Sequence, residues 1–388
     1  LNQERIKDLS QLLAQLSESD KLAGNAKLYL KGCCMETLGD LTPAQHPHCI
    51  SLLHMPNNLV VKLPESTFLL CNLTELNLCG NRLVEFPTVL FRLALLSKLN
   101  LGHNALCSLP HIPANAWPEL EVLMLYSNGI SQLPSSICYL KSLVYLSLDA
   151  NPIESLPRQI CYLHRLKSLY ISSLELLYLP QCLGSMRSLQ NLFADSNSRL
   201  AYIPGSLLQR WDRLPPFQSY MYRCGKLGPP AQALATHCSL SVVNPLSDVA
   251  SCLILPGEIS TIGDCYANCV PSLEELALRT VHRCFVVSSS GQSPDPTAAV
   301  FQQRLPRPLQ ELAGCPTALC IVCHSAVFVF AFPVVCYSEL DRMATFELSL
   351  ACSRACHAQL LSNPCASGYD AAKNEDVSVW LPVLVPPL

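Results

Sequence analysis

One twelve-residue phrase, Leu-x-Leu-x-x-Asn-x-Leu-x-x-Leu-Pro, recurs through the first half of this 388-residue chain and constrains its fold more than any other feature. The four clearest copies are centred on Asn81, Asn104, Asn128 and Asn151, and weaker copies precede and follow them. The marker position of the phrase falls at residues 58, 81, 104, 128, 151, 174 and 197. Successive markers are 23 or 24 residues apart. A period held this closely predicts a solenoid, in which each coil stacks on its neighbours.

The residue types of the phrase explain why such coils must stack. The leucines of each coil point into a core shared with the adjacent coils, so no coil is stable alone. We expect the asparagine to hydrogen-bond to backbone groups of its own and the adjacent coil, and the Leu-Pro pair to begin the convex return segment. Leu174 stands at one asparagine position, where a looser turn is expected. A degenerate eighth coil is expected at Leu28, Leu30 and Cys33.

The repeat has the length of a leucine-rich repeat, which sets the expected organisation of the chain. The expected fold class is α/β, a leucine-rich-repeat solenoid of about seven to eight coils with a small C-terminal α+β domain. We expect an N-terminal helix or cap over residues 1–25, the solenoid over 26–210, and a Pro- and Gly-rich cap or linker over 211–250. A second folded domain is expected over 251–365, followed by a disordered tail over 366–388.

The concave side of the solenoid's sheet, called the sheet face below, is the first candidate binding surface. Residues between the inward leucines of each strand point to solvent and line up from coil to coil. The rows that result mix aromatic with polar side chains, which suits recognition of a protein. The residues expected to bind a partner are Asn77, Asn100, Met124, Tyr126, Ser147, Asp149, Tyr170, Phe193 and Asp195. The alternative is a sheet face that binds nothing.

Composition and charge exclude several classes of protein. A formal net charge of -3 with 14% charged residues offers no basic field for nucleic acid. The 22 cysteines lack the regular spacing of a secreted disulfide scaffold, so most are expected to be buried reduced thiols. Cys138, Cys161 and Cys182 recur on the convex side and are expected to be small apolar filler. The uncharged stretch from Leu319 to Cys336 fits strands of a folded domain better than a membrane helix, which remains the alternative.

A metal site is the second candidate. Cys320-x-x-Cys323 and Cys352-x-x-x-Cys356 offer two pairs of thiolates, and four sulfur ligands are what one structural zinc requires. Cys315 could replace Cys323 as a ligand. A small domain has a limited core, and a metal cross-link would stabilise it. The alternative is four unligated buried cysteines, and the histidines that follow two of them are expected to be neighbours rather than ligands.

The third candidate is an amphipathic helix that begins near Pro271. Ser272 and Glu275 form a capping box, and the apolar residues that follow recur at i, i+3 and i+4, with Glu274 and Arg279 turned away from their face. The pattern resembles the elongin-binding box of cullin-ring ubiquitin ligase receptors, at Leu273, Leu276, Ala277 and Val281. A downstream stretch resembles the cullin box of the same receptors, at Leu305, Pro306, Leu309 and Leu312. A helix that packs on its own domain would show the same apolar face.

Together the repeats, the box-like segments and the cysteine pairs resemble a family of intracellular leucine-rich repeat-containing adaptor proteins. The likeness spans residues 26–361 and is most specific in the C-terminal part. It implies a cytoplasmic protein, with a nuclear location also open, and elongin B/C and a cullin as partners. We therefore expect a protein-binding adaptor that recruits substrates to a ubiquitin ligase, the alternative being a non-ligase signalling scaffold. The chain shows no phosphate loop, metalloprotease helix or nucleophile elbow, so no enzyme activity and no organic cofactor are expected.

Overall fold

The computed structural model divides the chain into two compact units. Unit 1 comprises Leu1–Glu175, Ser188–Asn197 and Gln218–Tyr222, and unit 2 the remainder. The residues that the structure describes are 8–15, 25–200, 202–207, 218–220, 239–243, 250–256, 259, 261–262, 275–280, 282, 316–320, 322–328, 330–340, 343–362 and 379–381. Each unit is described by itself.

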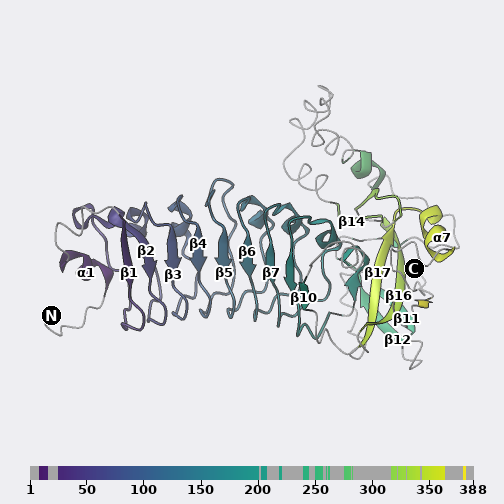
Figure 1. Cartoon of the computed structure of the whole chain (residues 1–388), viewed down its shortest axis with the longest axis horizontal. Helices are drawn as coiled ribbons and strands as arrows, with labels where there is room; N and C mark the ends of the chain where they lie inside the picture. The colour runs from purple at the N-terminus through teal and green to yellow at the C-terminus, as the bar shows by residue number, and fades with distance from the viewer. Residues whose placement is uncertain are drawn as a thin grey trace, which may run out of the picture. The chain divides into compact units, whose positions relative to one another are not determined.

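Unit 1 contains one parallel sheet of nine strands, one strand per coil (Figure 1). The strands are β1 (Ala26–Tyr29), β2 (Ile50–His54), β3 (Glu75–Asn77), β4 (Lys98–Asn100), β5 (Val122–Met124), β6 (Tyr145–Ser147), β7 (Ser168–Tyr170), β8 (Asn191–Phe193) and β10 (Gln218–Tyr220). The first leucine of the phrase is in register from strand to strand, so that Leu76 pairs with Leu99 and Leu146 with Leu169. The expected degenerate coil is present as β1, and β10 adds a strand where the sequence repeat has already ended.

The core of unit 1 consists of the periodic leucines. In the coils of β3 to β6 the first leucine of the phrase, within the strand, and the second, just after it, are buried to 2% exposure or less. Each fully buried leucine contributes about 1.5–3 kcal/mol relative to an exposed one. Because the residues between them point the other way, every strand has one face in this core and one on the sheet face.

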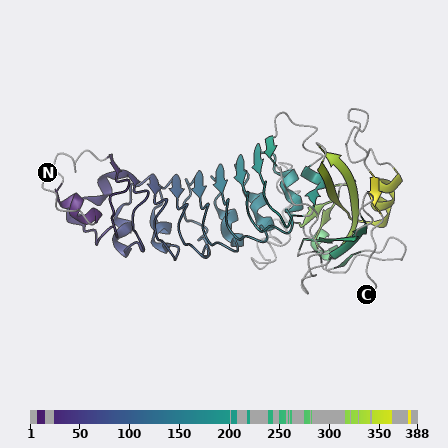
Figure 2. The same cartoon turned by 90° about the horizontal axis from the view of Figure 1, so that it is seen from below.

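Short 3-10 helices form the return segments of unit 1, on the side away from the strands (Figure 2). Those that follow the closing proline of the phrase are η3 (Glu65–Leu69), η4 (Thr88–Arg92), η5 (Ser135–Tyr139) and η6 (Arg158–Tyr162). Two earlier ones are η1 (Pro43–Gln45) and η2 (Pro47–Cys49). A proline lies immediately before η3, η4, η5 and η6, where its fixed φ is compatible with the turn and no hydrogen bond needs its missing N–H. A 23-residue coil has room for such a turn but for no longer helix.

The coil between Asn104 and Asn128 is one residue longer than the others and has no 3-10 helix in its return segment. Trp117 fills this place instead. Its side chain is 1% exposed, and its indole Nε1 donates a hydrogen bond of 2.7 Å to the Leu90 carbonyl of the preceding coil. A backbone φ of 50° accompanies this inward turn. The long coil is therefore closed by one aromatic side chain.

The repeated asparagines hold neighbouring coils together as the sequence predicts. In the buried Asn151, Nδ2 donates to the carbonyls of Leu148 in its own coil (2.6 Å) and Leu125 in the preceding coil (3.0 Å). Its Oδ1 accepts the backbone N–H of Ile130 at 3.1 Å. Asn58 and Asn197, from the weaker copies, make equivalent contacts. Each amide satisfies polar backbone groups that the turn would otherwise leave buried without partners.

Leu174 shows how one coil is completed without the amide. The N–H of Ile153, which an asparagine side chain would have accepted, donates instead to the backbone carbonyl of Asn151 at 2.9 Å. The Leu174 side chain is buried, and its own N–H donates to Asn197 Oδ1. The turn exchanges a contact between coils for a local backbone hydrogen bond, in agreement with the expected weakening.

A short helix, α1 (Leu9–Gln15), lies before the first coil. Leu9 and Leu13 are fully buried, so the helix covers apolar surface at this end of unit 1. Asp8 Oδ1 accepts the N–H of Gln11 and the hydroxyl of Ser10 at the start of the helix. The segment therefore acts as a cap on the solenoid core.

Unit 2 is built around two long antiparallel strands, β16 (Phe330–Leu340) and β17 (Met343–Ala351). They belong to a five-stranded sheet with β9 (Ile203–Pro204), β13 (Thr261–Ile262) and β18 (Val379–Leu381). Two hairpins accompany it, β11 (Ser239–Val243) with β12 (Ala250–Ile254) and β14 (Ala318–Leu319) with β15 (Ala326–Val327). The unit also contains η7 (Gln181–Ser185), helical residues 275–280 and helix α7 (Arg354–Ser362).

The uncharged segment from Leu319 to Cys336 contributes to β14, β15 and β16. The prediction of strands here is confirmed. Among the described residues, no helix combines the length and apolarity that crossing a membrane requires.

We predict that Asn151→Ala destabilises the chain by about 3 kcal/mol, because two carbonyls and one N–H lose their buried partner. Urea unfolding measures the change. Asn72→Ala is the control, since the exposed Asn72 side chain makes one contact with a backbone carbonyl, and a loss below about 0.5 kcal/mol is expected there. Equal losses in the two variants would contradict the role given to the asparagine column.

Candidate functional site

Four cysteine thiols from two separate segments meet in unit 2. The Sγ atoms of Cys320, Cys323, Cys352 and Cys356 all lie within 4.8 Å of one another. Cys352 Sγ lies 3.4 Å from that of Cys323 and 3.8 Å from that of Cys356. A tetrahedral zinc site with Zn–S bonds of about 2.3 Å requires S–S separations of about 3.8 Å. The cluster, called the cysteine cluster below, therefore has dimensions that suit a metal ion.

The first two cysteines lie on the turn of the β14–β15 hairpin. Cys320 N–H donates to the Ser325 carbonyl at 2.8 Å, and His324 N–H donates to the Cys320 carbonyl at 2.9 Å. His324 has a φ of 57°, which lets the chain reverse over so few residues. Cys323 Sγ also lies 3.2 Å from the Ser325 hydroxyl. The hairpin thus holds two thiols at one tip, with Cys320 buried and Cys323 exposed.

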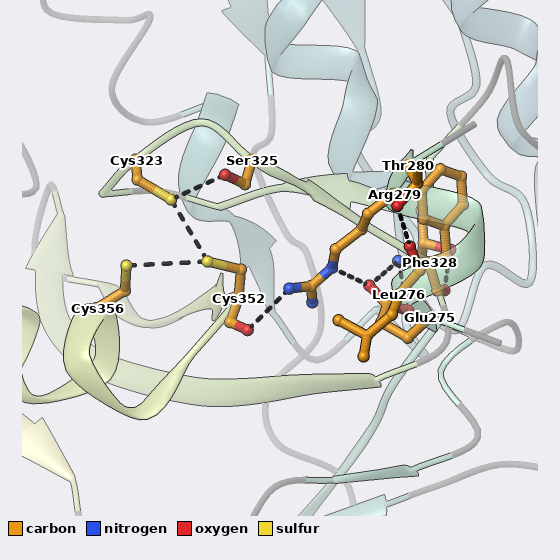
Figure 3. Close-up of polar contacts among 10 residues, drawn as sticks. Glu275, Leu276, Arg279, Thr280, Cys323, Ser325, Phe328, Cys352 and Cys356 are labelled. Carbon is orange, nitrogen blue, oxygen red and sulfur yellow. Dashed lines mark hydrogen bonds and ion pairs between the residues drawn. The ribbon is translucent and has the colours of Figure 1, made fainter. Parts of the chain in front are cut away.

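The other two cysteines lie where β17 ends and α7 begins. Cys352 directly follows the last residue of β17, and Cys356 lies in the first turn of α7. Ser353 joins them, since its Oγ accepts the N–H of Cys356 at 3.3 Å and its carbonyl accepts the N–H of His357 at 3.0 Å. The one-turn spacing on a helix start brings both thiols to the side where the hairpin tip lies (Figure 3).

Hydrogen bonds within the cysteine cluster favour one thiolate. The Cys352 side chain and the backbone N–H groups of Val322, Cys323 and Cys352 stabilise the charged form of Cys320, which lowers its pKa to about 4. The same contact with Cys320 raises the pKa of Cys352, and burial raises that of Cys356. A thiolate is the form of cysteine that binds metals. Neither neighbouring histidine belongs to the cluster, and Cys315 lies outside the described residues.

A helical turn over residues 275–280 lies beside the cysteine cluster and is held by an ion pair. Arg279 Nε donates to Glu275 Oε1 at 2.7 Å, with the two side chains 13% and 0% exposed. The Glu275 carboxylate also accepts the N–H of Phe328, at 3.0 and 3.1 Å, and Arg279 Nη1 donates to the Cys352 carbonyl at 3.2 Å. Arg279 lies on the opposite side of the turn from Leu276 and Ala277, as the spacing predicts, but that side faces the interior and not the solvent. Paired with Glu275, it lies inward, because the buried carboxylate needs a cation.

The opposite face of this turn contains part of the elongin-box-like set. Leu276 is 41% exposed and Ala277 is also exposed, whereas Leu278 on the inner side is buried. Leu273 and Val281 lie outside the described residues, as do all four cullin-box-like residues at 305, 306, 309 and 312. The structure therefore places only Leu276 and Ala277 of the eight, and both are accessible.

The sheet face of unit 1 carries an aromatic ladder over its last coils. The rings of Tyr170 and Phe193 stack with centroids 4.4 Å apart, and Tyr145 lies against Tyr170 at 4.9 Å. All three are partly exposed. Burial against its neighbours raises the pKa of Tyr145 to about 12, so its hydroxyl stays protonated. The ladder offers a flat apolar surface with a hydroxyl donor at each tyrosine.

Two carboxylates lie on the same part of the sheet face. Asp149 accepts the N–H of Ser172 at 2.7 Å and the hydroxyl of Ser147 at 3.0 Å, and Asp195 accepts the hydroxyl of Ser172. Burial is the main cause that raises the pKa of Asp149, and the charge of Asp195 adds to it. The sheet-face positions of β5 to β8 hold no lysine or arginine. This region is therefore anionic as well as aromatic.

Tyr126 gives the centre of the sheet face a different character. Its ring lies over Gly102, where an added Cβ would come within 2.5 Å of the ring, and its hydroxyl lies 3.3 Å from Cys79 Sγ. Asn77 and Asn100 accept backbone N–H groups of their own coils, at Cys79 and Gly102. Their side chains are thus tied to the sheet. Met124 and Ser147 complete the predicted set, half-buried and buried respectively.

A third row of sheet-face residues was missed from the sequence. It consists of Glu75, Lys98, Val122, Tyr145, Ser168 and Asn191. The alternation of the strand, followed two residues back from the row of Asn77 and Asn100, could have found it. Within this row Lys98 Nζ lies 2.7 Å from Glu75 Oε1, and His54 Nε2 lies 3.8 Å from Glu75 Oε2. Charges are paired at this end of the sheet.

The prediction that most cysteines are buried reduced thiols needs two corrections. Cys161 and Cys182 are disulfide-bonded, whereas Cys138 is free and buried. Among the free thiols outside the cysteine cluster, those of Cys33, Cys34, Cys71 and Cys107 are exposed. Cys33 and Cys107 donate weak hydrogen bonds to carbonyls two residues before them, which is how such a turn position satisfies a thiol locally.

Comparison with known proteins agrees with this architecture. Residues 107–201 match a family model described as a leucine-rich repeat region. The fold is a leucine-rich-repeat solenoid with a second, cysteine-containing unit. No curated protein matches the chain.

Solved structures show likeness over about half of the chain. A leucine-rich-repeat protein of Leptospira interrogans is 27% identical, with a TM-score of 0.38 over 48% of this chain and 52% of that one. The plant peptide hormone receptor RGFR1 in complex with RGF2 is 24% identical, with a TM-score of 0.38 over 47% and 28% of the two chains. The leucine-rich-repeat domain of the type III effector XopL is 22% identical, with a TM-score of 0.44 over 55% and 82%.

Proposed function

We propose that the chain is a protein-binding adaptor that holds a target on the sheet face of unit 1 and docks its unit 2 onto a ubiquitin-ligase core. The observation that supports docking most directly is the helical turn 275–280. Its inner side holds the buried Glu275–Arg279 pair, while Leu276 and Ala277 face solvent. An apolar outer face on an anchored turn is the arrangement that helix-in-groove recognition uses.

The partners proposed for this face are elongin B/C and a cullin. The proposal draws on the resemblance of Leu273, Leu276, Ala277 and Val281 to an elongin-binding box. It also draws on the resemblance of the chain to leucine-rich repeat-containing protein 28 and its relative, number 58. On this account the chain carries no catalytic group, and the ligase partners supply the chemistry. The location that follows is cytoplasmic or nuclear.

For the target, we propose a protein segment with a basic side chain. The aromatic ladder provides contact area. Asp149 and Asp195 provide negative charge, and the sheet-face positions of β5 to β8 contain no lysine or arginine to neutralise it. An arginine or lysine of the target would stack on Tyr170 and pair with a carboxylate. Asn77, Asn100 and Met124 would border this contact, with Tyr126 between them and the carboxylates.

We further propose that the cysteine cluster binds one structural zinc through Cys320, Cys323, Cys352 and Cys356. Zinc held by four thiolates cross-links the segments that carry them. The four Sγ atoms lie within 4.8 Å of one another, close to the spacing of about 3.8 Å in such a site, and hydrogen bonds favour a thiolate at Cys320. The β14–β15 hairpin would thereby be joined to the start of α7.

The zinc proposal predicts one bound zinc per purified chain and a loss of affinity greater than about a hundredfold in Cys356→Ser, because a lost second-shell partner alone costs about 10–100-fold. Elemental analysis and competition with a chromophoric chelator measure both quantities. Cys107→Ser, which removes an exposed cysteine outside the cluster, should bind zinc like the unchanged chain. A chain without zinc, or equal affinity in the two variants, would refute the site.

The docking proposal predicts that Leu276→Asp with Ala277→Asp abolishes binding of purified elongin B/C to the full chain. Both positions are exposed, so charges there should leave the fold intact. Isothermal titration calorimetry measures the binding. The matched control is Val84→Asp with Leu95→Asp, which places the same charges on apolar residues that are 52% and 49% exposed in unit 1.

No binding by the unchanged chain would leave the non-ligase scaffold as the function. Tyr170→Ser with Asp149→Asn should keep elongin binding and lose the target, since these residues belong to the sheet face. Loss of elongin binding in this variant would contradict the division of roles between the two units.

A further inference from the structure

We infer that the Glu275–Arg279 pair couples metal binding at the cysteine cluster to the placement of the helical turn 275–280. This inference rests on the zinc and docking roles proposed above and adds a link between them. Figure 3 shows Arg279 between Glu275 and Cys352, with its guanidinium directed toward the Cys352 carbonyl. The pair is therefore a positioning element that connects two sites.

The helical turn bridges the same two segments that a metal ion would join. Its Glu275 carboxylate accepts the N–H of Phe328, which directly follows β15 of the hairpin that carries Cys320 and Cys323. Its Arg279 donates to the carbonyl of Cys352 on the other segment. Movement of either segment changes the distance that one of these contacts has to span.

Burial makes the link stiff. Glu275 is fully inaccessible and Arg279 is 13% exposed, so breaking either contact removes a hydrogen bond from a buried charge that water cannot replace. Arg279 Nη2 is itself buried without a hydrogen-bond partner among the described residues. Negative charge nearby stabilises a guanidinium in this position. A metal ion held by four thiolates is a net anionic centre, and the Arg279–Cys352 contact brings a cation next to it.

The same pair decides which side of the turn faces out. Glu275 and Leu278 are on the buried side, and Leu276, Ala277 and Thr280 are on the exposed side. With the metal bound, the two segments are fixed and the pair holds this orientation. Without it the segments are free to separate, and the turn loses the anchor that keeps Leu276 outward. The coupling acts in both directions. Loss of the ion pair reduces the free energy of metal binding by the same amount as loss of the metal destabilises the anchored orientation of the turn.

The test compares the full chain with Arg279→Met, which keeps the apolar stem and removes the charge and the donors. Zinc alone is the probe. Competition with a chromophoric chelator gives zinc affinity, and hydrogen exchange read by mass spectrometry gives the protection of amides 275–280 with and without zinc. We expect zinc affinity to fall about 10–100-fold in Arg279→Met. In the unchanged chain, chelation should speed exchange of these amides, and in the variant exchange should be fast in both states.

Arg354→Met is the matched control, because this arginine at the start of α7 lies between two cluster cysteines in sequence but is exposed. Its zinc affinity and its amide response should match those of the unchanged chain. If Arg279→Met does not fold, Arg279→Lys is the alternative, because lysine keeps the charge but cannot contact Glu275 and the Cys352 carbonyl at the same time. We expect its zinc affinity to fall less than that of Arg279→Met. Unchanged amide protection of the paired strands β16 and β17 reports the folding of unit 2 in every sample.

Three results separate the outcomes. Tight zinc binding that Arg279→Met leaves intact, or amides 275–280 equally protected with and without zinc, overturns the coupling while the zinc site stands. If Arg354→Met lowers zinc affinity as much as Arg279→Met does, the effect comes from the loss of any nearby positive charge, and the coupling is also overturned. An unchanged chain that binds no zinc overturns the zinc site and the coupling together.

Discussion

The side-chain amide of one repeated asparagine is the interaction on which the rest of unit 1 depends. Asn151 satisfies carbonyls in its own coil and in the coil before it, and accepts an N–H from that preceding coil as well. Asn197 makes the equivalent contacts between the coils of β8 and β7, so that Phe193 and Tyr170 come from separate coils and still stack. Between the coils of β7 and β6, where Leu174 replaces the asparagine, the strand pairing alone keeps Tyr170 in register with Tyr145. The candidate binding surface therefore depends in part on how the turns are stabilised.

Unit 2 differs from unit 1 because its contacts join short segments that are distant in sequence. Cys320 and Cys352 belong to a hairpin and to the end of a long strand, and their thiols nevertheless lie in one cluster. Beside them, Glu275 and Arg279 place an ion pair in the interior, which is costly unless every charged group has a partner. Arrangements of this kind add little net stability but tolerate few alternative geometries. This explains how so short a helical turn can hold a defined outer face.

Much of unit 1 and the membership of the cysteine cluster could be predicted from the sequence, because both depend on local spacing. A 23-residue period fixes strands, inward leucines and return turns, and paired cysteines at short spacing indicate thiols that can meet in one cluster. Prediction failed where contacts are not local. Arg279 has the polarity of a solvent-facing residue, and only the buried Glu275 explains its inward position. Trp117 and strand β10 lie where the repeat is interrupted or has ended, so no period points to them.

The central claim is that the chain has two separate protein-binding surfaces, the sheet face and the outer face of residues 275–280. Site-specific photo-crosslinking in cells tests it most directly, with a benzophenone amino acid in place of Tyr170, Leu276 or, as the control, the exposed Leu95. The account predicts that Tyr170 and Leu276 capture different proteins and that Leu95 captures neither set. The account would be contradicted if Tyr170 and Leu276 captured the same proteins, or if neither position captured any protein that the Leu95 control does not capture.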